Sequence, residues 1–193
     1  METATRYVYD GREPVRTSTY ANGVAQLEKA GQDRPFTFRE NILTLVEAHE
    51  RGDNSLFKTW LDSCTGVATK KNSTKFAIVP QESNLINIPA YFREQFLQVN
   101  YDAVHVITEL DSTNGKYNQL LQEGDILTHD GWLNAVEGDA VLLKAYRDII
   151  FHGFKKEKAM GFYVRQNTKN DELRALFVGN LNSSFYASGN SNL

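Results

Sequence analysis

Histidine and carboxylate side chains are the groups of this chain that could carry acid–base chemistry or hold a metal ion. The four histidines lie far apart in the sequence, at His49, His105, His129 and His152. No two of them have the H-x-x-x-H or H-E-x-x-H spacing that presents two imidazoles on one helix face. We therefore predict no metal site, no cofactor and no catalytic residue set. An enzyme that uses His105 or His129 as its base stays an alternative, with Glu109 or Asp130 as the partner in a concave pocket.

Loops that bind phosphate or calcium have strict spacings, and this chain does not meet them. Neither G-x-x-x-x-G-K-[ST] nor G-x-G-x-x-G occurs. Residues 111–115 begin like a calcium loop, but Gly115 stands at the fifth place and Gln122 stands where the twelfth-place glutamate is needed. We predict an Asx-type turn there instead. The single cysteine, Cys64, can form no intramolecular disulfide, and we interpret it as a buried structural residue.

Composition favours one globular domain over residues 1–193, with a net charge of −3 and a pI near 5.8. This charge disfavours nucleic acid as a partner, because the only basic clusters, at 70–71 and 155–158, are short. The N-terminus lacks the apolar stretch of a signal peptide, and no run of residues is long enough to span a membrane. We expect a cytoplasmic protein, with a virion component as the alternative.

The stretch from Asn180 to Leu193 differs in composition from the rest of the chain. It mixes Asn, Ser and Gly with the adjacent aromatics Phe185 and Tyr186, directly after a strand pattern over residues 173–178. Tyr and Phe supply contact area at low entropic cost, while Ser, Gly and Asn adapt their hydrogen bonds. This mixture favours a recognition surface. A frayed polar chain end is the alternative, because Gly/Ser/Asn-rich ends are commonly disordered.

The same segment resembles the variable region of retroelement-diversified proteins with a C-type-lectin-like fold. Asn, Ser, Tyr, Phe and Gly are the residues reached when the adenines of an asparagine codon are replaced, and residues 172–178 resemble the framework strand before such a region. The resemblance implies a C-type-lectin-like arrangement at the C-terminus, with a protein or other macromolecule as ligand. Its ligand-facing residues would be Asn180, Asn182, Ser183, Ser184, Phe185, Tyr186, Ser188, Asn190 and Asn192.

The leading hypothesis is thus a non-enzymatic binding module with a diversified C-terminal surface. A structural or assembly protein, such as a virion or particle component that forms a homo-oligomer, is the first alternative. An enzyme with an unrecognised site is the second. Loss of binding after deletion of residues 180–193, with an unchanged melting temperature, would support the leading hypothesis.

The elements that must position these residues indicate an α+β fold with a helix-rich body and a small antiparallel sheet. We predict helices over residues 20–30, from a Thr37–Glu40 capping box to Gly52, and over 55–63, 90–99, 116–122, 131–136 and 139–151. Strands are predicted over 6–9, 74–79, 85–88 and 101–110, with a polar loop at 66–72. Residues 1–155 form the body. Residues 156–193 form a hairpin of strands 161–166 and 173–178 and the polar-aromatic segment.

Overall fold

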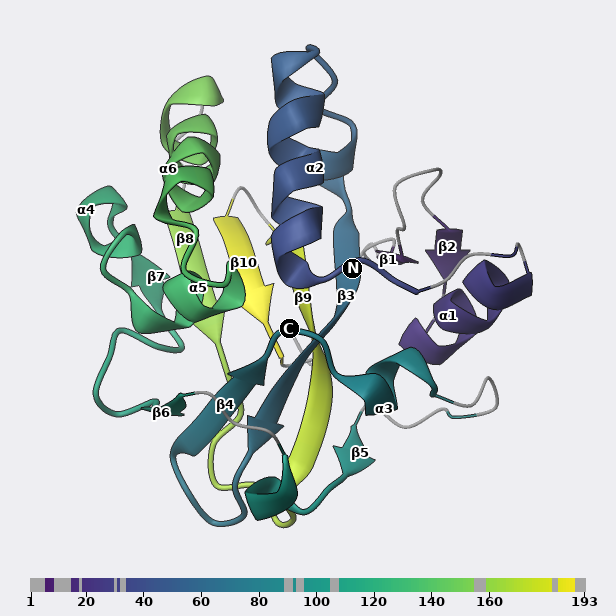
Figure 1. Cartoon of the computed structure of the whole chain (residues 1–193). Coiled ribbons are helices and arrows are strands. Elements are labelled where there is room, and N and C mark those ends of the chain that lie inside the picture. The colour runs from purple at the N-terminus through teal and green to yellow at the C-terminus, as the bar shows by residue number, and fades with distance from the viewer. Residues whose placement is uncertain are drawn as a thin grey trace.

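A computed structural model shows a twisted mixed sheet with helices on both of its faces (Figure 1). It describes residues 6–8, 15–17, 19–29, 31, 34–88, 92, 96–104, 108–154, 159–181 and 184–189. The strands are β1 (Arg6–Val8), β2 (Val15–Thr17), β3 (Trp60–Thr69), β4 (Lys75–Val79), β5 (Leu97–Gln98), β6 (Glu109–Asp111), β7 (Leu120–Leu121), β8 (Ala159–Tyr163), β9 (Glu172–Leu181) and β10 (Ser184–Ser188).

The two long strands β3 and β9 form the centre of this sheet. Its main order is β2-β1-β3-β9-β10-β8-β7, while β4 pairs with β3 and with β6, and β5 pairs with β9. Most pairs are antiparallel, but β1 runs parallel to β3 and β10 runs parallel to β8. The small antiparallel sheet that the sequence predicted is therefore wrong in size and in strand direction, whereas the α+β class is confirmed.

Short helices connect and cover these strands. The α-helices are α1 (Tyr20–Lys29), α2 (Phe38–Glu50), α3 (Ser83–Ile86), α4 (Glu123–Ile126), α5 (Asp130–Ala135) and α6 (Ala140–Asp148). Two 3-10 turns, η1 (Leu56–Lys58) and η2 (Tyr101–Ala103), and one π-helical turn, η3 (Ile149–Gly153), complete the described elements. None of the described helices has the length and apolar character needed to cross a membrane.

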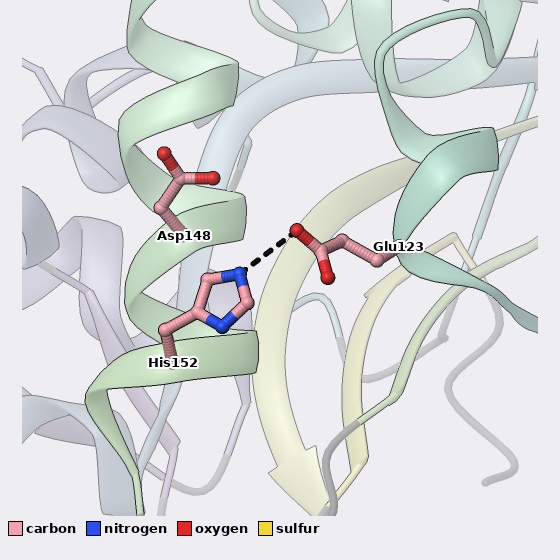
Figure 2. Close-up of side chains that lie close together, drawn as sticks. All are labelled: Glu123, Asp148 and His152. Atoms are coloured by element: carbon pink, nitrogen blue, oxygen red, sulfur yellow. Dashed lines mark hydrogen bonds and ion pairs between the residues drawn. The ribbon is translucent and has the colours of Figure 1, made fainter.

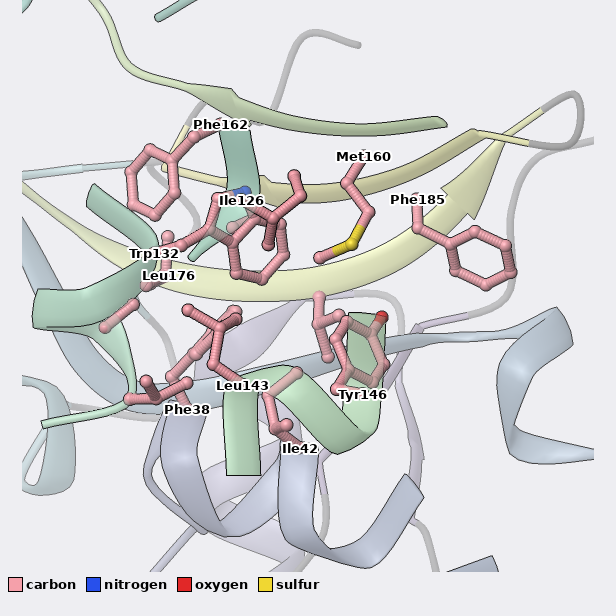
Figure 3. Packing of buried hydrophobic residues seen from close by; sticks show 14 of the residues in the cluster. Phe38, Ile42, Ile126, Trp132, Leu143, Tyr146, Met160, Phe162, Leu176 and Phe185 are labelled. Atoms are coloured by element: carbon pink, nitrogen blue, oxygen red, sulfur yellow. The ribbon is translucent and has the colours of Figure 1, made fainter. Parts of the chain in front are cut away.

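The main core lies between one face of the sheet and the helices α2, α5 and α6. Figure 3 shows Phe38 and Ile42 of α2 and Tyr146 of α6 pointing towards the sheet, where Phe162 of β8 and Phe185 of β10 meet them. All five side chains are almost completely buried. Burying a side chain of this size stabilises a fold by roughly 1.5–3 kcal/mol, so this face holds the sheet and helices together.

A smaller apolar layer covers the opposite face. Ala68 of β3, Ala77 of β4 and Leu173 of β9 point to this side and pack with Leu85 of α3 and Tyr101 of η2. Neighbouring residues of the same strands point to the main core, as Val67, Phe76 and Ile78 do. The central strands are therefore buried on both faces, which removes the alternation typical of a half-exposed strand.

Two predicted helix starts are confirmed by their capping contacts. The amide of Glu40 donates to Oγ1 of Thr37 at 3.2 Å, and the amide of Thr37 donates to Oε2 of Glu40 at 2.7 Å, which forms the capping box of α2. Asp139 caps α6, because its Oδ1 accepts from the amide of Leu142 at 3.0 Å. These local signals need only a few adjacent residues, so they can be read from sequence.

The predicted helix over residues 55–63 and the predicted loop at 66–72 are wrong. Only Leu56–Lys58 forms a helical turn, and Trp60–Thr69 forms the buried strand β3. Its polar residues are hydrogen-bonded inside the protein: Ser63 Oγ donates to the carbonyl of Leu176 at 2.5 Å, and Thr65 Oγ1 donates to that of Pro80 at 2.7 Å. A strand whose buried positions include satisfied hydroxyls lacks an apolar pattern, which is why the sequence was misread.

The segment between residues 80 and 122 also differs from its prediction. In the predicted strand over 85–88, Leu85 and Ile86 belong to helix α3 instead, and in the predicted helix over 90–99, Leu97 and Gln98 form strand β5. Residues 90, 91 and 93–95 lie outside the described part of the chain. In the predicted strand over 101–110, residues 101–103 form the 3-10 turn η2 and Glu109 and Leu110 belong to strand β6, while residues 105–107 lie outside the described part of the chain. Leu120–Leu121 in the predicted 116–122 helix forms the edge strand β7. These elements are short, so tertiary pairing outweighs local propensity.

The C-terminal hairpin was predicted with the right strands and the wrong partners. Strands β8 and β9 exist, but they do not pair with each other. Strand β10 lies between them, antiparallel to β9 and parallel to β8 (Figure 1). The segment interpreted as a surface end of the chain thus supplies an interior strand of the sheet.

Candidate binding surface

Strand β10 places consecutive side chains of the predicted binding segment on opposite faces of the sheet. Phe185 and Ala187 join the main core, so Tyr186 and Ser188 belong to the other face. Asn180 and Ser184 are strand residues that pair with Phe185 and Leu181. The remaining predicted residues, Asn182, Ser183, Asn190 and Asn192, lie outside the described part of the chain.

Burial corrects two of the predicted ligand-facing residues. Phe185 is only 2% exposed, and its ring packs against Phe57 at a centroid distance of 6.1 Å and against Phe154 at 5.8 Å. Ser188 is 0% exposed. Neither side chain can meet a ligand at the surface in this structure. The two adjacent aromatics, read together as one recognition element, therefore have opposite tasks: Phe185 anchors β10 to the core, and Tyr186 is partly exposed.

Tyr186 is flanked by a glycine on each neighbouring strand. Its register partner on β8 is Gly161, and its partner on β9 is Gly179. A Cβ at Gly161 would lie 2.5 Å from the ring of Tyr163, and a Cβ at Gly179 would lie 2.5 Å from the ring of Trp60. Both glycines therefore leave room for an aromatic ring to lie close against the backbone.

Four aromatic side chains consequently gather on this face, and we name them the outer aromatic face: Trp60, Tyr163, Phe177 and Tyr186. The rings of Tyr163 and Tyr186 meet edge to face with centroids 5.2 Å apart, and those of Trp60 and Phe177 stack at 4.9 Å. The two tyrosines are partly exposed, whereas Trp60 and Phe177 are buried. The tyrosine pair is the accessible part of the face, and the Trp60–Phe177 stack is its buried part.

The hydroxyls are the polar groups of this tyrosine pair. Within the described part of the chain, no hydrogen bond joins either hydroxyl to another side chain or to the backbone. Burial, with a smaller contribution from Tyr186, raises the pKa of Tyr163 above its usual value. The hydroxyl of Tyr163 therefore stays protonated at neutral pH and can donate as well as accept a hydrogen bond.

Sequence reasoning missed Trp60, Tyr163, Gly161 and Gly179 as parts of one surface. Trp60 was assigned to a helix, so its position beside β9 could not be inferred. A signal was nevertheless present, because Gly161 stands two residues before Tyr163, and Gly179 stands two residues after Phe177. Glycine and an aromatic residue two places apart lie on the same face of one strand.

A second group of side chains brings Glu123, Asp148 and His152 together at the surface (Figure 2). Their ligand atoms lie within 4.8 Å of one another, and Nε2 of His152 is 2.9 Å from Oε1 of Glu123. One imidazole and two carboxylates are a donor set that a divalent metal could use. Glu123 lies far from Asp148 and His152 in the sequence, so their proximity becomes visible only in the folded protein, where α4 lies beside the end of α6 and η3.

Neighbouring cations already neutralise these carboxylates. Nζ of Lys144 lies 2.6 Å from Oδ2 of Asp148, and Nη2 of Arg147 lies 2.5 Å from its Oδ1. Nε of Arg147 also lies 3.8 Å from Oε1 of Glu123. A metal ion would have to compete with both cations, and His152 is 64% exposed rather than held in a concave pocket. The arrangement is an ion-pair network that joins α4 to the end of α6.

His129, one of the two histidines considered as a catalytic base, has a structural role instead. Nδ1 of His129 accepts from the amide of Trp132 at 3.3 Å, which caps α5, and Nε2 lies 3.3 Å from the carbonyl of Lys116. Nε2 therefore carries the proton and donates it. Burial lowers the pKa of His129, so the ring is neutral in its buried position between Tyr117 and Phe162. His105 lies outside the described residues.

Two acidic residues near the predicted turn, Asp111 and Glu109, have identified partners as well. Oδ1 of Asp111 accepts from the amide and the hydroxyl of Thr113 at 2.9 and 2.8 Å, which confirms the predicted Asx-type turn. Glu109 forms an ion pair with Lys75 at 2.5 Å. Cys64 is buried, as predicted, although it lies in β3 rather than at a helix end.

Comparison with known proteins decides the fold. A solved structure, presented in work on the accommodation of massive sequence variation in Nanoarchaeota by the C-type lectin fold, superposes with a TM-score of 0.68. The match covers 93% of this chain and 94% of that one, at 17% sequence identity. The chain has the C-type lectin fold. No protein-family model and no curated protein matches the sequence.

The C-type lectin fold extends over nearly the whole chain, whereas the sequence suggested it only for the C-terminal segment. The resemblance inferred from residues 180–193 is thus confirmed as a fold relationship, and its placement at the C-terminus alone is corrected. At this low identity the likeness concerns the fold and transfers no ligand.

Proposed function

We propose that this protein is a non-enzymatic binding module that contacts a protein partner through Tyr163 and Tyr186. The observation that carries the proposal is the tyrosine pair itself. Two partly exposed rings lie on adjacent interior strands. Neither hydroxyl bonds to a described residue, and Gly161 and Gly179 flank Tyr186. Rigid aromatic rings with a polar end are the side chains that dominate protein-binding surfaces.

The position of the pair on interior strands supports this use. Strand β10 is hydrogen-bonded on both sides, and Phe185 fixes it to the core. A ring held on such a strand loses little conformational freedom when it binds, which lowers the entropic part of the binding free energy. The surface is therefore rigid before it meets its partner.

The diversified surface suggested by the sequence belongs to the same proposal. The composition of residues 180–193 supports variation at positions that do not hold the core. Under this proposal Tyr186 accepts many substitutions without loss of folding, whereas Phe185 does not.

The pairing of β3 with β9, which come from the two halves of the chain, supports treating residues 1–193 as one domain.

Point substitution tests the proposal better than deletion of residues 180–193, because deletion would remove β10 from the sheet. Tagged wild-type protein and the Tyr163→Ala/Tyr186→Ala double variant are used to capture partners from a host lysate, with each captured protein quantified by mass spectrometry. Val141→Ala is the matched control, since Val141 is 82% exposed on α6, away from the tyrosines.

The expected result is a partner captured by wild type and by Val141→Ala and lost with the tyrosine variant, at equal melting temperatures. Equal capture by all three proteins would refute the proposal. The assembly alternative is separated by light scattering: a wild-type oligomer that becomes monomeric in the tyrosine variant would mean that the partner is a second copy of the chain.

A further inference from the structure

A cavity of about 620 Å³ lies between the end of β4 and the segment that joins β5 to η2. One wall is formed by Val79, Pro80, Gln81, Glu82 and Asn84, and the other by Gln98, Val99, Asn100, Ala103 and Val104. The volume is in the range of small-ligand sites. None of these residues belongs to the outer aromatic face, so the cavity is a separate feature of the molecule.

Both walls are anchored to the central strands. The amide of Glu82 donates to the carbonyl of Cys64 at 3.0 Å, which ties the first wall to β3. The amide of Val99 donates to the carbonyl of Asp171 at 3.3 Å, just before β9. Because β3 and β9 pair with each other, the distance between the two walls is fixed by the sheet.

The charge of the lining selects against anions. Among the described lining residues, Glu82 is the single charged side chain, and it is 7% exposed. Its Oε1 already accepts from the amide of Asn84 at 3.0 Å and from Nδ2 of Asn84 at 2.8 Å. An anion would find no cation among the described lining residues and would be repelled by the Glu82 carboxylate. The cavity therefore suits a ligand without negative charge.

Four carboxamides supply the polar contacts: Gln81, Asn84, Gln98 and Asn100. Two of them have orientations fixed by their partners. Nδ2 of Asn84 donates to Glu82, which leaves Oδ1 to accept, and Oδ1 of Asn100 accepts from the amide of Asp102 at 3.2 Å, which leaves Nδ2 to donate. Asn84 thus offers an acceptor on one wall and Asn100 a donor on the other, beside the aliphatic side chains of Val79, Pro80, Val99 and Val104.

We propose that this cavity binds a short uncharged peptide segment in an extended conformation. The carboxamide donors and acceptors match the alternating C=O and N–H groups of a peptide backbone, and the valine and proline surfaces match its apolar side chains. A neutral sugar shares the hydrogen-bonding groups, but the described lining contains no aromatic ring against which a sugar ring could pack. The valine-rich wall favours the peptide.

The experiment titrates the full-length protein with acetyl-Val-Ala-Val-amide and follows the side-chain amide signals of glutamine and asparagine by NMR. The expected result is saturable shifts at Gln81, Asn84, Gln98 and Asn100. Acetyl-Asp-Ala-Asp-amide, which carries two negative charges, should bind at least about tenfold more weakly. Failure of the neutral peptide to shift these signals would overturn the proposal.

Two variants locate the site. Ala103→Trp places an indole in the cavity and should weaken peptide binding by about tenfold or more, because a filled pocket cannot accept the ligand. Gln26→Trp, at an exposed position of α1, is the matched control and should bind as wild type does. Equal binding by both variants would also overturn the proposal, as would displacement of the peptide by glucose or mannose. Melting curves confirm that each variant is folded.

Discussion

Arg174 and Glu172, two residues apart on β9, form a buried ion pair with Nη2 of Arg174 3.0 Å from Oε2 of Glu172. Their side chains are only 3% and 6% exposed. Burial lowers the pKa of Arg174, and the guanidinium also lies over the ring of Phe96 at 5.0 Å. Arg165 contributes a second cation, 3.6 Å from the same carboxylate oxygen. Strand β9 thus carries a buried ion pair inside the protein.

Removing one member of this pair should destabilise the protein more than removing both. Arg174→Met leaves the buried carboxylate of Glu172 with Arg165 alone, and we expect a loss of about 3–5 kcal/mol in the free energy of unfolding. The double variant Arg174→Met/Glu172→Leu should recover a large part of that loss. Urea denaturation measures both values, and a single variant as stable as wild type would contradict the assignment.

Phe185 and Tyr186 should respond differently to truncation, because they lie on opposite faces of β10. Phe185→Ala removes a ring from the main core and should cost about 3–5 kcal/mol in the free energy of unfolding. Tyr186→Ala removes only the edge-to-face contact with Tyr163, worth about 0.5–1.5 kcal/mol beyond buried area. Thermal and chemical unfolding of the two single variants tests this. Equal losses would show that the face assignment is wrong.

The hydroxyl of Tyr146 should be replaceable with a gain in stability. The side chain is fully buried between α6 and the sheet, and its oxygen has no hydrogen-bond partner among the described residues. A buried hydroxyl without a partner carries a desolvation penalty of roughly 1–3 kcal/mol, so Tyr146→Phe should raise the free energy of unfolding by about 1 kcal/mol. A lower value for the phenylalanine variant would indicate a hydrogen bond to ordered water.

Acid should weaken the start of α2 through Glu40. The side-chain hydrogen bond from Arg34, with Nη1 and Nη2 each 2.8 Å from a carboxylate oxygen, lowers the pKa of Glu40 below its usual value. Because the folded-state pKa is depressed, this stabilisation is complete above the unfolded value and is lost as pH falls through the folded value.

We therefore expect the stability of wild type to fall below about pH 4.5 more steeply than that of Glu40→Gln, in which this titration is absent. Glu28→Gln, at an exposed position of α1, serves as the control and should follow the wild-type curve. Urea unfolding at a series of pH values measures the slopes. Parallel curves for wild type and Glu40→Gln would exclude Glu40 as a source of the acid sensitivity.

Cys64 should be unreactive in the folded protein. The thiol is buried in β3, where it donates to the carbonyl of Pro35 at 3.2 Å, and burial raises its pKa to about 11. Since the thiolate is the reactive form, a disulfide reagent such as Ellman's reagent at pH 8 should label native protein far more slowly than protein unfolded in urea. Rapid labelling of the native protein would show that this part of β3 opens to solvent.

The sequence predicted those elements whose signals are local. The capping box of α2 and the Asp139 cap of α6 depend on residues three apart in the chain, so they could be read directly. Strand β3 could not, because Ser63 and Thr65 are buried and are satisfied by carbonyl groups of distant residues. Its hydrogen-bonding partners become known only with the fold.

The candidate surface was predicted only in part, because its contacts also join residues that are distant in the sequence. Tyr186 was identified from its neighbourhood in sequence, but its contact with Tyr163 depends on the parallel pairing of β10 with β8. That pairing replaces the hairpin expected between residues 161–166 and 173–178. A local reading favours adjacent strands as partners, and here a strand later in the sequence separates them.

The insertion of β10 between β9 and β8 also sets the order in which the protein can be assembled during synthesis. β8 and β9 leave the ribosome before Phe185 and Ala187 of β10 do. Until β10 emerges, the edge of β8 that carries Met160 and Phe162 has no paired strand. Nascent chains in this state expose a strand-sized gap that β10 of another copy could fill. Emergence of Ser188 from the ribosome and pairing of β10 therefore end the interval in which this fold is open to strand exchange.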